Sequence, residues 1–224
     1  MGRMADKFRL VYGQKLETSY SNFKNFTIEC FRVFPSTDIN MFNLDIPHKD
    51  FKKKPGTYCR LMGGSRYIMD DSLFREHGYE PFLMAARGNI LIVGLGLGMA
   101  LESVLKEPEV ASVTVLEEER NLIKLMEPYF EDSAVPLRMI KGSLFGDFTK
   151  LMPQQGRFFD TVLIDIFPNI ENTNERRAMI EVARSRLLPL IKPVRFNKTE
   201  RAIFVWGEPY MKYFPRGKGP DYRM

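Results

Sequence analysis

Runs of apolar residues alternate with amphipathic stretches through the central part of the chain. Five short runs rich in Val, Leu and Ile predict strands, at residues 90–93, 112–116, 137–141, 160–164 and 202–206. Four longer stretches have the spacing typical of helices, at residues 73–87, 99–106, 121–130 and 173–188. Strands that alternate with helices form parallel sheets, and a continuous apolar run indicates a strand covered on both faces. The pattern therefore predicts an α/β fold.

The first helical stretch contains two residues that disfavour a helix interior, Gly78 and Pro81. Glycine has little helix propensity, and proline removes a backbone donor and clashes with the preceding turn. We expect the helix over residues 73–87 to break near one of them.

The first 70 residues have a different pattern from the rest. Short aromatic and β-branched runs at residues 8–12, 26–34 and 41–46 are separated by polar or proline-containing breaks. Two further runs flank Gly63-Gly64, a pair that can take the positive φ angles of a tight hairpin. We predict a small all-β domain over residues 1–70.

A glycine-rich turn directly follows the strand at residues 90–93. Gly94, Gly96 and Gly98 let the backbone bend sharply and approach a ligand, and the next helix presents free N–H groups. Glu117 stands about twenty positions further on, where an acidic residue can accept both ribose hydroxyls. The turn predicts a nucleoside site.

The spacing of this turn favours one class of nucleoside over another. Met99 stands where the dinucleotide fingerprint G-x-G-x-x-G requires glycine or alanine. The spacing G-x-G-x-G favours the nucleoside end of S-adenosylmethionine over NAD. The alternative is a turn that packs a helix on a sheet and binds no ligand.

Two aspartates are candidates for contact with a substrate. Asp165 follows the strand at residues 160–164, at the edge where open α/β sheets bind ligands, and it is the one base we would name. A cap or a loop-ordering group is the alternative role. Asp71, in the helix-start sequence Asp70-Asp71-Ser72, is either part of a cap or faces a cationic substrate.

Composition excludes several other classes of protein. Cys30 and Cys59 lie in strand-like segments without a C-x-x-C motif, which indicates reduced core thiols. His48 and His77 are too few and too far apart to predict a metal site. The chain has no run of about 18 apolar residues and no apolar leader. We expect a soluble cytoplasmic protein without a metal.

Positive charge gathers in the last part of the chain. Residues 184–224 contain ten Lys and Arg against three Asp and Glu, interleaved with aromatic residues. Such a segment could bind nucleic acid through phosphate contacts and stacking. Because the charges are scattered and no RNA-binding signature is present, a solvated tail or a contact between subunits of a homo-oligomer is favoured.

Three motifs resemble those of a known family. They are ILIVGLGLG for the glycine loop, PEVASVTVLEEE for the strand that ends in Glu117, and DTVLID for the strand before Asp165. From residue 69 to 208 the order of elements resembles the spermidine synthase group within the class I S-adenosylmethionine-dependent methyltransferase fold, and especially its small methyltransferase-like relatives.

The resemblance implies a domain arrangement and a set of roles. A Rossmann-like nucleoside-binding domain would span residues 71–208, with or without the C-terminal antiparallel hairpin, and a basic tail would span 209–224. The residues implied at the nucleoside are Gly94, Leu95, Gly96, Gly98, Glu117, Gly142 and Ser143. By the same resemblance, Asp165 faces the transferred group, and Tyr79 and Glu80 contact the substrate.

Departures from the family pattern bear on the substrate. Leu97 replaces an acidic residue of the glycine loop, Ser143 replaces an aspartate at the adenine, and Asp165-Ile166-Phe167-Pro168 keeps one carboxylate of two. A polyamine needs several carboxylates to offset its desolvation. The motif after Asp165 also differs from the N/D-P-P-Y/F/W sequence that grips a flipped base.

The sequence therefore favours a transferase that binds S-adenosylmethionine and methylates a small-molecule acceptor. The enzymatic alternative is aminopropyl transfer from decarboxylated S-adenosylmethionine to a polyamine. The non-enzymatic alternative is a methyltransferase-like fold kept for binding or assembly.

Overall fold

The computed structural model of the protein describes residues 26–33, 56–64, 66–71, 73–146, 158–167, 174–192 and 202–206. Its main feature is a parallel sheet of five strands. These are β4 (Gly88–Val93), β5 (Val110–Glu117), β6 (Leu137–Lys141), β7 (Thr161–Ile164) and β8 (Ile203–Val205). The order across the sheet is β6-β5-β4-β7-β8, and all pairs are parallel.

This strand order places a switch point between β4 and β7. The chain adds β5 and β6 on one side of β4 and then crosses to add β7 and β8 on the other. Ligands of open α/β sheets bind at the carboxyl ends of the strands beside such a point. The predicted α/β fold is confirmed, and the sheet is Rossmann-like.

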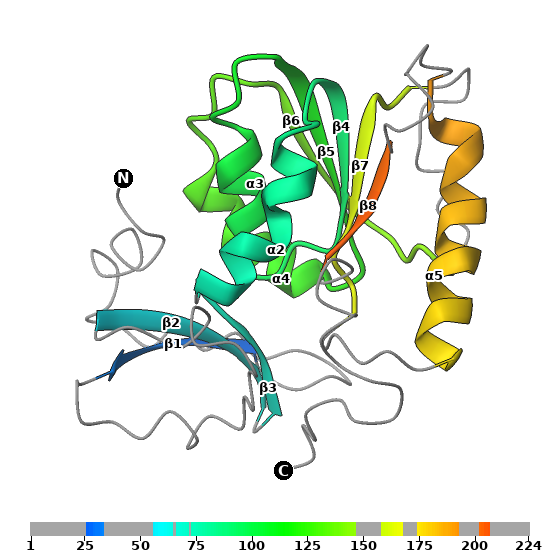
Figure 1. The fold of residues 1–224 in the computed structure, drawn as a ribbon. Coiled ribbons are helices and arrows are strands. Elements are labelled where there is room, and N and C mark those ends of the chain that lie inside the picture. The colour runs from blue at the N-terminus through cyan, green and yellow to red at the C-terminus, as the bar shows by residue number, and fades with distance from the viewer. Residues whose placement is uncertain are drawn as a thin grey trace.

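Helices cover both faces of the sheet (Figure 1). On one side lie α2 (Leu73–Leu83), α3 (Met99–Val104) and α4 (Arg120–Met126), and on the other lies α5 (Asn174–Leu187). The short helices η3 (Glu127–Tyr129) and η5 (Leu188–Leu190) extend α4 and α5. In β4, Ile90 and Ile92 join the core on one side, and Leu91 and Val93 join the core on the other. Burial on both faces explains the continuous apolar run.

Helix α2 runs through Gly78 without a break, and it ends at Leu83, two residues after Pro81, instead of continuing to residue 87 as predicted. A Cβ atom at Gly78 would lie 2.3 Å from Nε1 of Trp206, so the glycine makes room for the indole ring. Pro81 stands in the last turn, where the helix has only two residues left. Tertiary packing of Tyr79 and Phe82, both buried, holds a helix that local propensity disfavours.

A small antiparallel sheet precedes the parallel one. It consists of β1 (Phe26–Val33), β2 (Gly56–Gly63) and β3 (Arg66–Asp70) in the order β1-β2-β3. Gly64, with φ of 64°, lies between β2 and β3, which confirms the predicted hairpin, whereas Gly63 belongs to β2 and not to the turn. The strand predicted at residues 26–34 is also confirmed, whereas the runs at residues 8–12 and 41–46 lie outside the described residues.

The two sheets share one hydrophobic core. Five buried residues of the small sheet belong to the same cluster as Ile90 and Ile92 of β4, namely Phe26, Ile28, Cys59, Leu61 and Met69. The small sheet lies below α2 and α4 in Figure 1, with β3 leading directly into α2. This packing brings the small sheet against the glycine loop.

Candidate functional site

A pocket of about 370 Å³ opens at the carboxyl ends of β4, β5, β6 and β7. This size falls in the range of small-molecule sites. Seven of the residues predicted for the site line it together: Gly94, Leu95, Gly96, Glu117, Gly142, Ser143 and Asp165. The remaining four, Gly98, Tyr79, Glu80 and Asp71, lie outside the lining.

The glycine loop between β4 and α3 needs its glycines for conformation and for packing. Gly94, Gly96 and Gly98 have φ angles of 97°, 51° and 71°, which side chains rarely adopt. A Cβ atom at Gly94 would lie 2.2 Å from the carbonyl oxygen of Asp165, and one at Gly98 would lie 2.8 Å from the ring of Phe130. The packing of the loop therefore requires glycine at both of these positions, whether or not a ligand binds.

Glu117 joins the end of β5 to the glycine loop. Its Oε2 accepts a hydrogen bond from Leu95 N–H at 2.8 Å, and its Oε1 accepts one from Glu119 N–H at 2.8 Å. Burial raises the pKa of Glu117, and the two N–H bonds partly oppose this rise. The backbone N–H of Glu118 also acts on this carboxylate, and a carboxylate has about four acceptor sites in all. Glu117 can thus hold the loop and still accept ribose hydroxyls.

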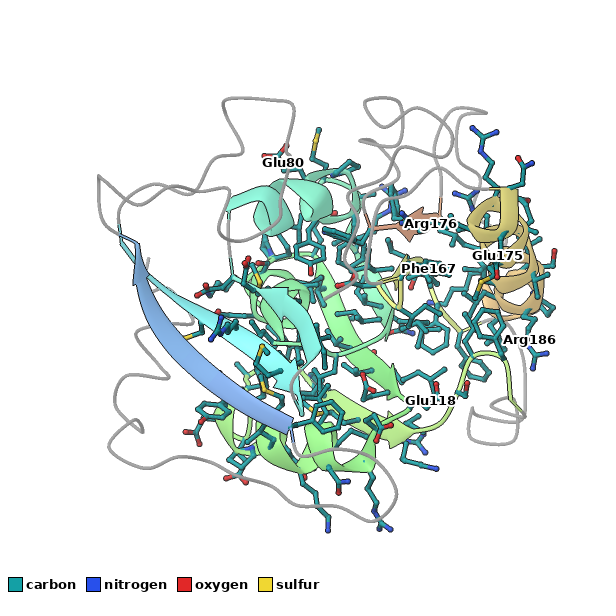
Figure 2. The ribbon with its side chains drawn as sticks, turned by 90° about the horizontal axis from the view of Figure 1, so that it is seen from below. Glu80, Glu118, Phe167, Glu175, Arg176 and Arg186 are labelled. Carbon is teal, nitrogen blue, oxygen red and sulfur yellow. The ribbon has the colours of Figure 1, made fainter. Side chains whose placement is uncertain are left out.

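The next two residues add further carboxylates to the pocket. Glu118 is exposed and Glu119 is half-buried, and both line the pocket beside Glu117. Figure 2 shows Glu118, which directly follows the last residue of β5. The charged residues among the described lining residues are Glu117, Glu118, Glu119 and Asp165, and no Lys, Arg or His is among them.

Asp165 is held from two sides at the end of β7. Its backbone N–H donates to Val93 O at 2.7 Å, which fixes the backbone against β4. The buried hydroxyl of Tyr79, on α2, donates to Oδ2 of Asp165 at 2.7 Å. The structure thus brings together two residues that the sequence placed at the substrate end of the site.

Asp71 and Glu80 lie apart from this pair. Asp71 is buried, its Oδ1 accepts a hydrogen bond from Cys59 N–H at 2.8 Å, and its own N–H donates to Cys59 O at 3.1 Å. These bonds join the end of β3 to β2. Glu80 is exposed on the outer side of α2, away from Glu118 and Phe167 (Figure 2). Neither residue contributes to the wall of the pocket.

Apolar residues complete the wall, and the sequence did not indicate them. The small sheet supplies Phe26, Leu61, Ile68 and Met69, and the strand ends of the parallel sheet supply Phe145, Ile166 and Phe167. Of these residues, only Phe145 could have been found from the sequence, because it is an aromatic residue just after the predicted turn at Gly142-Ser143. No local pattern indicated that the small sheet would face the glycine loop.

A buried arginine lies behind this wall. Arg176, on α5, donates through Nη2 to Trp206 O at 3.2 Å, and its guanidinium lies 5.4 Å from the ring centre of Phe167. Figure 2 shows Arg176 next to Phe167. The contact ties α5 to the ends of β7 and β8, and so positions one side of the pocket.

The strand order and the loop after β4 define the class of the protein as an α/β protein with a Rossmann-like sheet. No known protein family matches the sequence, and no curated protein is significantly similar to it. Within the described residues, no helix is long and apolar enough to cross a membrane. No group of three or more His, Cys, Asp or Glu in the same residues could hold a metal ion.

Several solved structures are similar to the chain at low identity. Spermidine synthase from Thermotoga maritima has 13% identity and a TM-score of 0.46, with 80% of this chain and 53% of that chain covered. A spermidine synthase in complex with the transition state analogue AdoDATO has 14% identity and a TM-score of 0.47, with the same coverage. The 23S rRNA methyltransferase ErmE has 14% identity and a TM-score of 0.35, with 48% of this chain and 40% of that chain covered.

The chain spans about half the length of the spermidine synthases that it matches.

Proposed function

We propose that the protein is a transferase that binds S-adenosylmethionine in this pocket and methylates a small molecule. One observation carries the proposal. Glu117, buried at the carboxyl end of β5 and hydrogen-bonded to the glycine loop, lines the same pocket as Ser143 and Asp165. A site for this nucleoside needs a hydrogen-bond acceptor for the ribose hydroxyls, a contact with the adenine and a group near the substrate that receives the methyl group. We assign these three roles to Glu117, Ser143 and Asp165, respectively.

The residues of the pocket fit the parts of the nucleoside. The carboxylate of Glu117, which lines the pocket, accepts the ribose hydroxyls. Gly142 and Ser143 follow β6, with the half-exposed ring of Phe145 beside them as a surface on which a flat base can lie. S-adenosylmethionine supplies a methyl group on a sulfonium, and the protein needs mainly to hold the acceptor in line with it. Asp165 then takes the proton that an amine or hydroxyl acceptor loses.

Thermal unfolding with and without nucleosides tests the proposal. A ligand at 100 times its dissociation constant stabilises the folded state by about 2.7 kcal/mol. For a chain of this size we expect a rise in Tm of about 5–10 °C with S-adenosylmethionine or S-adenosylhomocysteine, and none with NADH. A shift with NADH and with neither sulfur nucleoside would contradict the proposal. No shift with any of them would favour the non-catalytic alternative.

The pocket's charge supports a second candidate, aminopropyl transfer. Four carboxylates border the pocket, and two of them, Glu118 and Glu119, make up in number for the second carboxylate that this chain lacks in the motif that begins at Asp165. Decarboxylated S-adenosylmethionine carries one more net positive charge than S-adenosylmethionine, and a polyamine carries several. Ligands with several positive charges suit this pocket, because the described residues of its wall include carboxylates and no Lys, Arg or His.

Product analysis separates the two candidates. The protein is incubated with putrescine and decarboxylated S-adenosylmethionine, and in parallel with a panel of amines and alcohols and S-adenosylmethionine. Release of methylthioadenosine in the first reaction would identify aminopropyl transfer. Release of S-adenosylhomocysteine in the second alone supports methyl transfer, which is the outcome we expect.

A further inference from the structure

The backbone N–H groups of the glycine loop differ in what holds them. Three donate to oxygen atoms at 2.8 Å: Gly94 N–H to Leu116 O, Leu95 N–H to Glu117 Oε2, and Gly98 N–H to Leu95 O. Leu97 N–H instead donates to Sδ of Met69, at 3.3 Å. A thioether is a weak acceptor. Leu97 N–H is therefore the most weakly held of these four donors.

Met69 reaches the loop from the other sheet. It lies in β3, is buried and lines the pocket. A Cβ atom at Gly96 would lie only 2.3 Å from its sulfur, so the sulfur rests directly on the loop backbone. A methionine side chain is long and has three rotatable bonds. Its sulfur can therefore leave the loop by a change of rotamer while β3 stays in place, which would uncover the backbone at Gly96, a residue that lines the pocket, and at Leu97 next to it.

We propose that Met69 is a specificity-determining residue of the nucleoside site. Its sulfur holds Leu97 N–H in the free protein, and the carboxylate of an amino-acid tail takes this N–H when the nucleoside binds. The inference rests on the proposed function, because it assumes that the nucleoside occupies this pocket. Hydrogen bonds to an ionised acceptor are about twice as strong as neutral ones. The exchange therefore favours a nucleoside whose tail has a carboxylate.

The inference also distinguishes the two nucleosides considered above as sources of the transferred group. S-adenosylmethionine and S-adenosylhomocysteine have the carboxylate and displace the sulfur of Met69. Their decarboxylated forms have no group that can replace the sulfur as acceptor, and Met69 stays on the loop.

Substitution of Met69 by leucine tests this exchange. Leucine is shorter and has no sulfur, so in Met69→Leu nothing competes with the ligand for Leu97 N–H. Titration calorimetry should show S-adenosylhomocysteine binding about two- to tenfold tighter than to the wild type, the effect of one hydrogen bond. Decarboxylated S-adenosylhomocysteine, which lacks only the carboxylate, should change by less than about twofold. Met139→Leu is the matched control, because Met139 packs against the same core but does not line the pocket.

A measurement on the wild-type protein gives an independent readout. With ¹³C-labelled methionine methyl groups, S-adenosylhomocysteine should shift the resonance of Met69, and the decarboxylated analogue should leave it in place. Met84, which is 91% exposed, serves as the internal reference.

The outcomes distinguish the two proposals. If the wild type binds neither nucleoside, the proposed function is wrong and the role of Met69 falls with it. If the wild type binds both, but Met69→Leu changes their affinities equally or the Met69 methyl does not respond to S-adenosylhomocysteine, the role of Met69 is refuted and the proposed function stands.

Discussion

Glu117 serves the fold and the proposed site with the same carboxylate. A carboxylate that accepts two ribose hydroxyls makes charge-assisted bonds of roughly 1.5–3 kcal/mol each at most. We expect Glu117→Ala to weaken the binding of S-adenosylhomocysteine by about tenfold to a thousandfold. Glu118→Ala is the comparison: Glu118 also lines the pocket but is exposed, so we expect a smaller loss of affinity. Equal losses in calorimetry would mean that the strand register of the site is assigned wrongly.

The pKa of Glu117 adds a second test of the same role. Burial raises this pKa above the ordinary value of 4.5, so the carboxylate is protonated at a higher pH than that of an exposed glutamate. Protonation removes the charge that strengthens the bonds to ribose. The affinity for S-adenosylhomocysteine should therefore fall as the pH is lowered through the raised pKa, and the fall should be absent in Glu117→Ala.

The pair of Asp165 and Tyr79 makes a prediction about the chemical step. Asp165→Asn keeps the shape of the side chain but cannot take a proton, so transfer should slow by about 10²-fold or more, with nucleoside affinity nearly unchanged. Tyr79→Phe removes the hydroxyl that orients the carboxylate, and we expect a smaller loss, of about tenfold. Single-turnover transfer to the best acceptor of the panel measures both. An undiminished rate in Asp165→Asn would leave Asp165 as a structural group.

At the scale of elements, α2 shows where a sequence-based prediction fails and why. The five strands of the parallel sheet and the turn after the first of them were predicted correctly, because apolar runs and turn residues are local signals. The continuity of α2 depends on Trp206, which lies far along the chain and fills the space left by Gly78. No local pattern contains that contact.

The same contact predicts whether replacing Gly78 in α2 stabilises or destabilises the protein. Replacing glycine by alanine inside a helix usually stabilises it by about 0.5–1 kcal/mol. In Gly78→Ala the new Cβ atom would lie 2.3 Å from Nε1 of Trp206, and overpacking of this kind costs about 1–3 kcal/mol. We expect net destabilisation of about 1–2 kcal/mol in urea unfolding.

A double-mutant cycle shows whether the indole is the cause. Trp206→Phe makes room for the methyl group, so Gly78→Ala should cost less in that background. Stabilisation of the wild type by Gly78→Ala would mean that the indole does not pack on the helix as described.

At the scale of the whole molecule, the site depends on contacts between segments distant in sequence. Tyr79 and Asp165 are 86 residues apart, and Leu95 and Glu117 are 22 apart. The second pair follows from the spacing of a strand, a loop and a strand, and the sequence predicted that both residues belong to one site. The position of Met69 follows from the packing of one sheet on another, for which the sequence has no periodic signal. The roles of these residues toward a ligand stay predictions.

The packing of Trp206 on Gly78 gives the protein an internal optical reporter. Trp206 is the one tryptophan of the chain, and it is buried. An indole in apolar surroundings emits at shorter wavelengths than one in water. Its emission therefore reports whether the end of β8 remains packed against α2, beside the residue whose hydroxyl holds Asp165. Fluorescence of the unmodified protein can thus follow this side of the pocket without any added dye.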